Sequence, residues 1–87
     1  MQIVILDIDE AGNRRWYQND ELHRTDGPAV ERADGYKAWY VNGEYHRTDG
    51  PAIEWENWDK SWFLDGVELT KEQFNSPSYR EFIKYVI

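Results

Sequence analysis

Residues 39–52 read Trp-Tyr-Val-Asn-Gly-Glu-Tyr-His-Arg-Thr-Asp-Gly-Pro-Ala, and most of this stretch occurs twice in the chain. Residues 16–29 read Trp-Tyr-Gln-Asn-Asp-Glu-Leu-His-Arg-Thr-Asp-Gly-Pro-Ala, so each shared residue lies 23 positions earlier. A third copy begins on the same spacing at Trp62 and then departs from the pattern. A fixed period of this length is typical of repeat proteins, in which one supersecondary unit stacks on the next. The sequence therefore predicts a single repeat domain over residues 1–87.

Each repeat carries the signals of a β-hairpin. Asp34-Gly35 lies between two strand-like runs, and glycine supplies the positive φ that a tight turn needs. We expect hairpins over residues 3–17, 29–41 and 52–64, with turns at Gly12, Gly35 and near Asn57-Trp58. A second turn ends each return strand, at residues 19–20, 42–43 and 65–66, and a short strand is expected to follow it. The predicted fold is mainly β, a single-layer antiparallel meander of 23-residue hairpin repeats with a C-terminal α-helix.

Alternation along the return strand sorts its side chains onto two faces. One face carries Lys37, Trp39 and Val41, and the other carries Tyr36, Ala38 and Tyr40. Because the spacing repeats, we expect a ladder of stacked tryptophans on one face and a ladder of tyrosine or phenylalanine on the other.

The last quarter of the chain changes its period. Thr70 with Gln73 fits a capping box, and Ser76-Pro77 fits an N-cap followed by proline at the first helical position. We therefore expect a helical cap over residues 70–87. Its apolar stripe consists of Tyr79, Phe82, Ile83, Val86 and Ile87. A stripe this apolar predicts either packing on the chain's own sheet or the interface of a symmetric homodimer.

The composition restricts the function. A formal charge of −7 repels nucleic-acid backbones and anionic membranes, so we expect neither direct DNA binding nor membrane association. The chain has no cysteine, so it is compatible with a reducing cytosol. The apolar run at residues 1–6 is too short for a signal peptide or a membrane span. These features predict a cytoplasmic location.

The motif Trp-Tyr-x-Asn-Gly-x-x-His-Arg-x-Asp-Gly-Pro-Ala, over about residues 12–72, resembles that of small repeat proteins found in tailed phages and bacteria. More loosely, it is similar to MORN-type repeats, which have a comparable period and a β-hairpin unit. The resemblance implies a single-layer antiparallel sheet and a non-enzymatic binding role. It also implies a part in phage counter-defence, since some phage proteins of this appearance are thought to sequester cyclic nucleotide signals. For a phage-encoded chain, the location would be the host cytoplasm.

The repeated His-Arg-Thr-Asp string holds the side chains with the most chemistry. Arginine with histidine and threonine can grip a phosphate, and neighbouring rings can stack a base. The expected ligand-binding residues are Trp16, His23, Arg24, Thr25, Trp39, Tyr40, His46, Arg47 and Thr48. The alternative is structural: Asp-Gly-Pro sets a turn, threonine or aspartate bonds its own backbone, and arginine pairs with a nearby glutamate.

Two functions follow from these patterns. The first is a binding protein that sequesters a nucleotide-type ligand, in the manner the resemblance implies. The alternative is an acidic inhibitor that covers a basic, nucleic-acid-binding surface of a host protein. No nucleophile–base constellation and no tight cluster of metal ligands is recognisable, so we expect no enzyme, no cofactor and no metal site.

Overall fold

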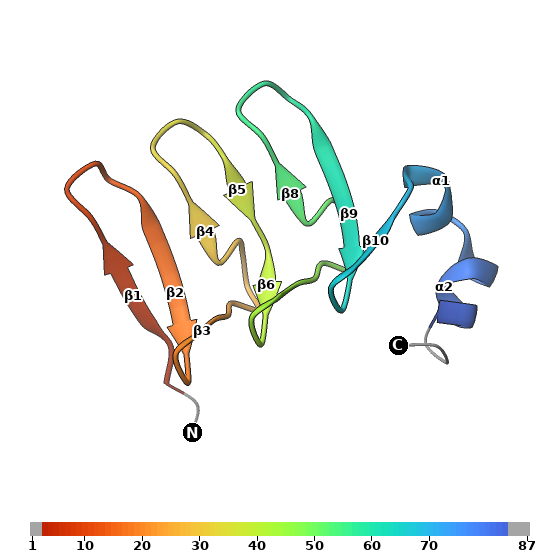
Figure 1. Cartoon of the computed structure of the whole chain (residues 1–87), viewed down its shortest axis with the longest axis horizontal. Helices are drawn as coiled ribbons and strands as arrows, with labels where there is room; N and C mark the ends of the chain where they lie inside the picture. The colour runs from red at the N-terminus through yellow and green to blue at the C-terminus, as the bar shows by residue number, and fades with distance from the viewer. Residues whose placement is uncertain (1–2, 84–87) are drawn as a thin grey trace.

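The computed structural model describes residues 3–83, which form one thin layer of 43 × 36 × 16 Å. The chain forms three hairpins and two short helices. Figure 1 shows the hairpins side by side, with the helices at the C-terminal end of the row. All the strand pairings are antiparallel. The predicted fold class, an antiparallel meander with a C-terminal helical segment, is confirmed.

The strands follow the repeat. The three hairpins are built from β1 (Ile5–Ile8) with β2 (Arg14–Gln18), β4 (Val30–Glu31) with β5 (Lys37–Ala38), and β8 (Ile53–Glu54) with β9 (Lys60–Leu64). Short strands near the second turns are β3 (Glu21–Leu22), β6 (Tyr40–Val41), β7 (Glu44–Tyr45) and β10 (Val67–Leu69). The main sheet runs β1-β2-β4-β5-β8-β9-β10, with β3 paired to β2, while β6 and β7 form a separate pair.

The hairpin tips lie at one position of the repeat. Gly12 and Gly35 have φ values of +88° and +101°, which glycine adopts without steric cost. In the third hairpin Trp58 stands at that position with φ +75°. The amide of each tip residue donates to the carbonyl three residues earlier, at 3.0–3.1 Å. The predicted turns are therefore confirmed, although the third one holds a tryptophan in the left-handed region.

Backbone hydrogen bonds join each unit to the next. The amide of Trp16 donates to the carbonyl of Ala29 at 2.9 Å, and that of Trp39 donates to Ala52 at 2.7 Å. Both alanines are fully buried, because the neighbouring unit lies directly against them. A larger side chain there would separate the units, which explains the alanine at the end of the repeated motif.

One face of the sheet carries the expected ladder of tyrosine and phenylalanine. The ring centroids of Tyr40 and Tyr45 are 4.5 Å apart, and those of Tyr45 and Phe63 are 4.8 Å apart. These rings pack on a core cluster of Val30, Tyr36, Ala38 and Ile53. Burial, together with a hydrogen bond to Tyr45, raises the pKa of Tyr36 to about 12. This face is the hydrophobic core of the middle of the sheet.

The expected ladder of stacked tryptophans on the other face is wrong. The guanidinium of Arg24 lies 3.9 Å from the ring centroid of Trp16, and that of Arg47 lies 3.8 Å from that of Trp39. Each indole is therefore covered by an arginine of its own repeat. Trp62, in the third repeat, instead packs against a second core cluster, made of Leu64, Leu69, Phe74 and Ile83.

The C-terminal segment forms α1 (Lys71–Phe74) and α2 (Pro77–Ile83). The capping box of Thr70 and Gln73 is confirmed, since each side chain bonds the other residue's amide. Arg80 of α2 donates from Nη2 to the carbonyl of Thr48 at 3.1 Å and so ties the helix to the second repeat.

The predicted oligomer stripe is divided by this packing. Ile83 is 3% exposed and Tyr79 packs beside it in the chain's own second core cluster, whereas Phe82 is 60% exposed. Val86 and Ile87 lie outside the described residues. The homodimer through this stripe stays a prediction. In such a dimer Phe82 would contact the second copy, whereas Ile83 would keep its contacts with the chain's own core cluster.

Replacing Gly35 by valine tests the assignment of the turns. A β-branched residue at φ +101° is strained, so we expect Gly35→Val to lower the free energy of unfolding by about 1 kcal/mol or more. Ala33→Val, an exposed change in the same tip, is the control and should leave stability nearly unchanged. Equal urea midpoints for the two variants would contradict the turn assignment.

Candidate functional site

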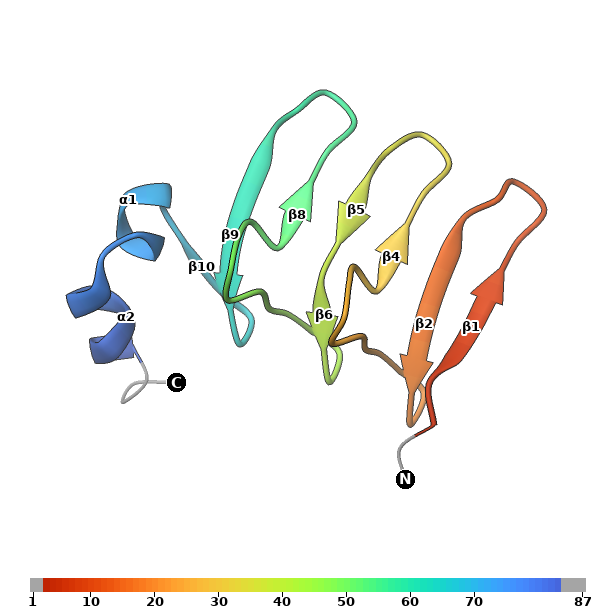
Figure 2. The same ribbon diagram turned by 180° about the vertical axis from the view of Figure 1, so that it is seen from behind.

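Two equivalent loops carry the His-Arg-Thr-Asp string, and we name them the first His-Arg loop (residues 23–29) and the second His-Arg loop (residues 46–52). The first connects β3 to β4 and the second connects β7 to β8. Figures 1 and 2 show that each connection leads from one hairpin to the next. The loops therefore lie at the junctions between units, where the chain leaves one hairpin and enters the next.

The histidine of each loop is bonded to the second turn of the following unit. Nδ1 of His23 accepts from the amide of Asn42 at 3.0 Å, and Nδ1 of His46 accepts from the amide of Asp65 at 2.9 Å. An imidazole nitrogen accepts only when it carries no proton, so the bond from Asn42 fits the Nε2–H tautomer of His23. Nδ1 of His46 also lies 3.2 Å from Oδ1 of Asp65. Both histidines thus have a structural role at a junction, and His23 is buried as well.

The arginine of each loop is held by several groups. Nε of Arg47 donates to Oδ1 of Asp49 at 2.9 Å, and its Nη1 donates to the carbonyl of Pro51 at 3.1 Å and to Oε2 of Glu54 at 3.3 Å. Arg24 repeats the first two bonds at the same distances, with Asp26 and Pro28. The guanidinium fork therefore closes the loop on itself while its flat face covers the indole.

The glycine of Asp-Gly-Pro makes this arrangement possible. A Cβ atom on Gly27 or Gly50 would lie 2.9 Å from the guanidinium carbon of Arg24 or Arg47. At that distance the guanidinium would have to shift, so glycine lets the loop pass the arginine without moving it off its partners. The aspartate and the glycine of the motif thus both have a direct contact with the position of the arginine.

The aspartates of the two loops are exposed, and the pKa of each is lowered by its arginine. The side chains of Asp26 and Asp49 are 83% and 82% exposed. The hydrogen bond from Arg24, with its charge, holds the pKa of Asp26 below its ordinary value, and Arg47 does the same for the pKa of Asp49. Ion pairs this exposed contribute little to stability, because water competes for both partners.

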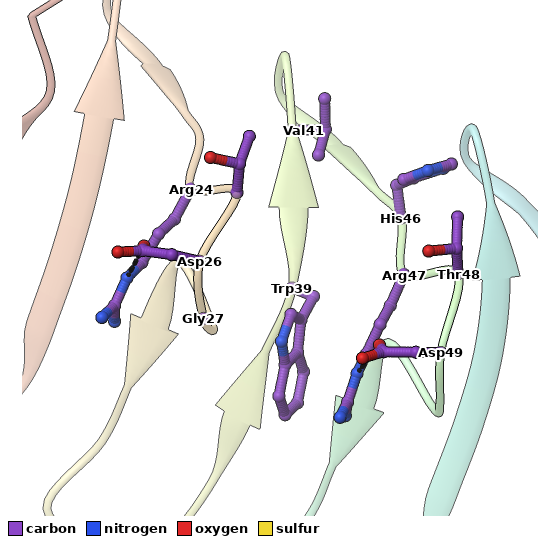
Figure 3. Close-up of a pocket in the computed structure, with 10 residues that line it drawn as sticks. Arg24, Asp26, Gly27, Trp39, Val41, His46, Arg47, Thr48 and Asp49 are labelled. Atoms are coloured by element: carbon purple, nitrogen blue, oxygen red, sulfur yellow. Dashed lines mark hydrogen bonds and ion pairs between the residues drawn. The ribbon is translucent and has the colours of Figure 1, made fainter.

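A groove lies between the two loops, with a volume of about 640 Å³. Figure 3 shows Trp39 in its middle, with the Arg24–Asp26 pair on one side and the Arg47–Asp49 pair on the other. It is lined by Arg24, Thr25, Asp26, Gly27, Trp39, Val41, His46, Arg47, Thr48 and Asp49. We name this feature the inter-repeat groove.

The structure brings together six of the nine predicted site residues in this groove: Arg24, Thr25, Trp39, His46, Arg47 and Thr48. The other three lie apart from it. Trp16 is covered by Arg24, His23 is buried at its junction, and Tyr40 packs in the tyrosine ladder of the core face. Alternation places Tyr40 and Trp39 on opposite faces, which was the signal for separating them.

Sequence reasoning omitted Asp26, Gly27, Val41 and Asp49 from the site. The two aspartates belong to the repeated string, so the period itself was a signal that they accompany the arginines. Their carboxylates give the groove both signs of charge. The exposed hydroxyls of Thr25 and Thr48 add donors and acceptors. Such a groove can bind a polar ligand that presents both hydrogen-bond donors and acceptors.

Comparisons of this chain with family models, with curated proteins and with solved structures found no match. Among residues 3–83, no group of three histidine, cysteine, aspartate or glutamate side chains is placed to hold a metal ion. Neither helix of that described part is long and apolar enough to cross a membrane.

Removing one loop arginine tests its structural role. Arg47→Ala deletes the bonds to Asp49 and Pro51 and uncovers Trp39, so we expect a loss of about 2 kcal/mol in the free energy of unfolding. Arg14→Ala is the control, because that side chain is 56% exposed and its ion pair with Glu31 is long, at 3.8 Å. Comparable denaturation midpoints for the two variants would show that the loop arginine does not support the fold.

Acid should weaken the loops. The pKa values of Asp26 and Asp49 are lower in the folded chain than their ordinary value of 3.8. Their contribution is therefore fully present well above pH 3.8 and is lost as the pH falls through the lower folded values. Urea titrations between neutral pH and pH 3 should show this decline, and the double variant Asp26→Asn/Asp49→Asn should show a shallower one. Parallel pH profiles would contradict the assignment.

Proposed function

We propose that this chain is a non-catalytic binding protein that takes a nucleotide-type ligand in the inter-repeat groove. The observation that carries the proposal is the meeting of two arginines, two threonine hydroxyls and an indole in one groove of about 640 Å³. Ligand pockets of small molecules usually measure about 300–1,000 Å³. A bound nucleotide would be removed from solution and not converted, which is sequestration.

The arginines are paired, so a phosphate must compete for them. Two carboxylates compete for Arg47, those of Glu54 and Asp49, and the side chain of Asp49, at 82% exposed, is the one that can turn into water. An exposed pair of this kind is worth about 1 kcal/mol or less, whereas a phosphate offers more acceptor oxygens to the same fork. In the binding step that we propose, a phosphate of the ligand displaces the Asp49 carboxylate from the guanidinium of Arg47. The hydroxyl of Thr48 donates a hydrogen bond to the same phosphate.

The resemblance of the repeated motif to small phage and bacterial repeat proteins suggests the biological setting. In that setting the ligand would be a cyclic nucleotide signal of bacterial defence, and the chain would act in counter-defence in the host cytoplasm. An acidic inhibitor of a basic host protein is the second candidate. The observation that favours it is a tryptophan at the tip of the third hairpin that is 86% exposed.

Calorimetry against a panel of cyclic di- and trinucleotides tests the groove. If phosphate displaces a carboxylate, Asp49→Asn should tighten binding about tenfold, because the competitor for Arg47 is removed. Arg47→Lys should weaken binding, because an ammonium lacks the planar fork. The control is Asp20→Asn, which removes the same charge from a turn outside the groove.

The size of the Asp49→Asn effect relative to the control decides the mechanism. Equal gains in Asp49→Asn and Asp20→Asn would mean that only overall charge matters and would remove the displacement step. No heat for any nucleotide at tens of micromolar, with either Asp49→Asn or the unchanged chain, would remove the nucleotide ligand.

A further inference from the structure

The tip of the third hairpin differs from the other two at one position. Positions 12, 35 and 58 are spaced by the repeat, and they hold Gly12, Gly35 and Trp58. The three turns are otherwise alike, because the amide at this position donates to the carbonyl three residues earlier in each. Trp58 therefore occupies the turn position at which the other two hairpins have glycine.

Trp58 contributes strain to the fold and almost no burial. Its φ is +75°, in the left-handed region that bulky residues rarely occupy. Its side chain is 86% exposed, the highest value among the large apolar residues of the described chain. A tryptophan in this state leaves most of its ring in water, so the folded chain alone does not explain it.

A second groove, with charged residues along it, lies beside Trp58. This groove has a volume of about 380 Å³ and includes Trp55, which is held edge-on against Tyr36 with ring centroids 6.2 Å apart. Glu56 and Asp59 flank the tryptophan and are exposed. Figure 1 shows the three hairpin tips along one edge of the sheet, away from the second turns. The charged residues that line this groove are three acids, Glu54, Glu56 and Asp59, and two bases, Lys37 and Lys60.

The two lysines lie opposite one shared carboxylate, which also accepts from Arg47. Lys37 and Lys60 are each the cross-strand partner of Glu54, on β5 and β9 respectively. The carboxylates of Glu56 and Asp59 are the ones that flank the exposed ring in the sequence, on a chain of net charge −7. The chemistry that complements an indole surrounded by carboxylates is a cation on an apolar stem.

We propose that the Trp58 tip is a docking site for a basic, arginine-rich surface of a partner protein. Trp58 would be the central anchor, because tryptophan buried in a partner's pocket dominates the energy of many interfaces. Arginine side chains of the partner would stack on the indole and pair with Glu56 and Asp59. This site rests on the second candidate function, the acidic inhibitor of a basic host protein, and it is independent of the inter-repeat groove and of any nucleotide there.

The variant Trp58→Gly separates docking from folding. It restores the glycine of the other two tips and relieves the strain, so we expect its melting temperature to equal or exceed that of the unchanged chain. We expect its affinity for a fluorescent peptide of nine arginines, measured by anisotropy, to fall about tenfold. Phe82→Ala, which removes another exposed ring without changing the charge, should leave that affinity unchanged.

Charge controls exclude a purely electrostatic attraction. Glu56→Gln/Asp59→Asn should weaken peptide binding more than Asp20→Asn/Glu68→Gln, which removes the same charge from exposed positions elsewhere. Acrylamide quenching of the Trp58 indole should decrease when the peptide binds. Unchanged affinity in Trp58→Gly, equal losses in the two charge variants, or a lower melting temperature in Trp58→Gly would overturn the proposal. Arg47→Lys should not alter peptide binding, so a failure of the groove ligand leaves this test intact.

Discussion

The contact between a loop arginine and a tryptophan supports each complete repeat. A single-layer sheet has no second layer to cover a large ring, so the indole needs another cover. Arg24 and Arg47 supply it at 3.9 and 3.8 Å from the ring centroids, and their edges are satisfied by an aspartate and a backbone carbonyl. A charged group can lie on an apolar ring in this way because its hydrogen bonds are already made.

The same contact explains why the repeat ends in a helix. The position that holds Arg47 in the second unit holds Thr70 in the third, 23 residues later. Threonine cannot cover Trp62, but its hydroxyl caps α1 by accepting from the amide of Gln73. The helix that starts there places Phe74 and Ile83 in the cluster on which Trp62 packs. The changed residues of the third copy, among them Leu69, Thr70 and Phe74, thus replace a cationic cover by an apolar one.

At the other end of the sheet, the first half-unit lacks both kinds of cover. Asp7 and Ile8 stand where the second unit has Val30 and Glu31, so the polar and apolar sides of the strand are exchanged. In consequence all four residues of β1 are exposed, and an apolar edge strand remains open to pairing with another chain. The 23-residue period predicted a strand at the position of β1. Because its polar and apolar positions are exchanged, no side chain of β1 is buried, and the core does not extend beneath this strand.

The period and the turn residues were enough to predict the meander, because glycine at positions 12 and 35 and alternation between them leave few other folds. They were not enough to predict the site. Alternation assigns Trp39 to a face but does not tell whether another indole or a guanidinium will cover it, since that depends on a loop whose path is set by Gly50. The aspartates were overlooked for the same reason: Asp49 enters the groove only because Arg47 is anchored over the ring and holds it there. A repeated polar string in a thin sheet is thus best interpreted first as the cover of its own aromatic residues, and a ligand must compete with that role.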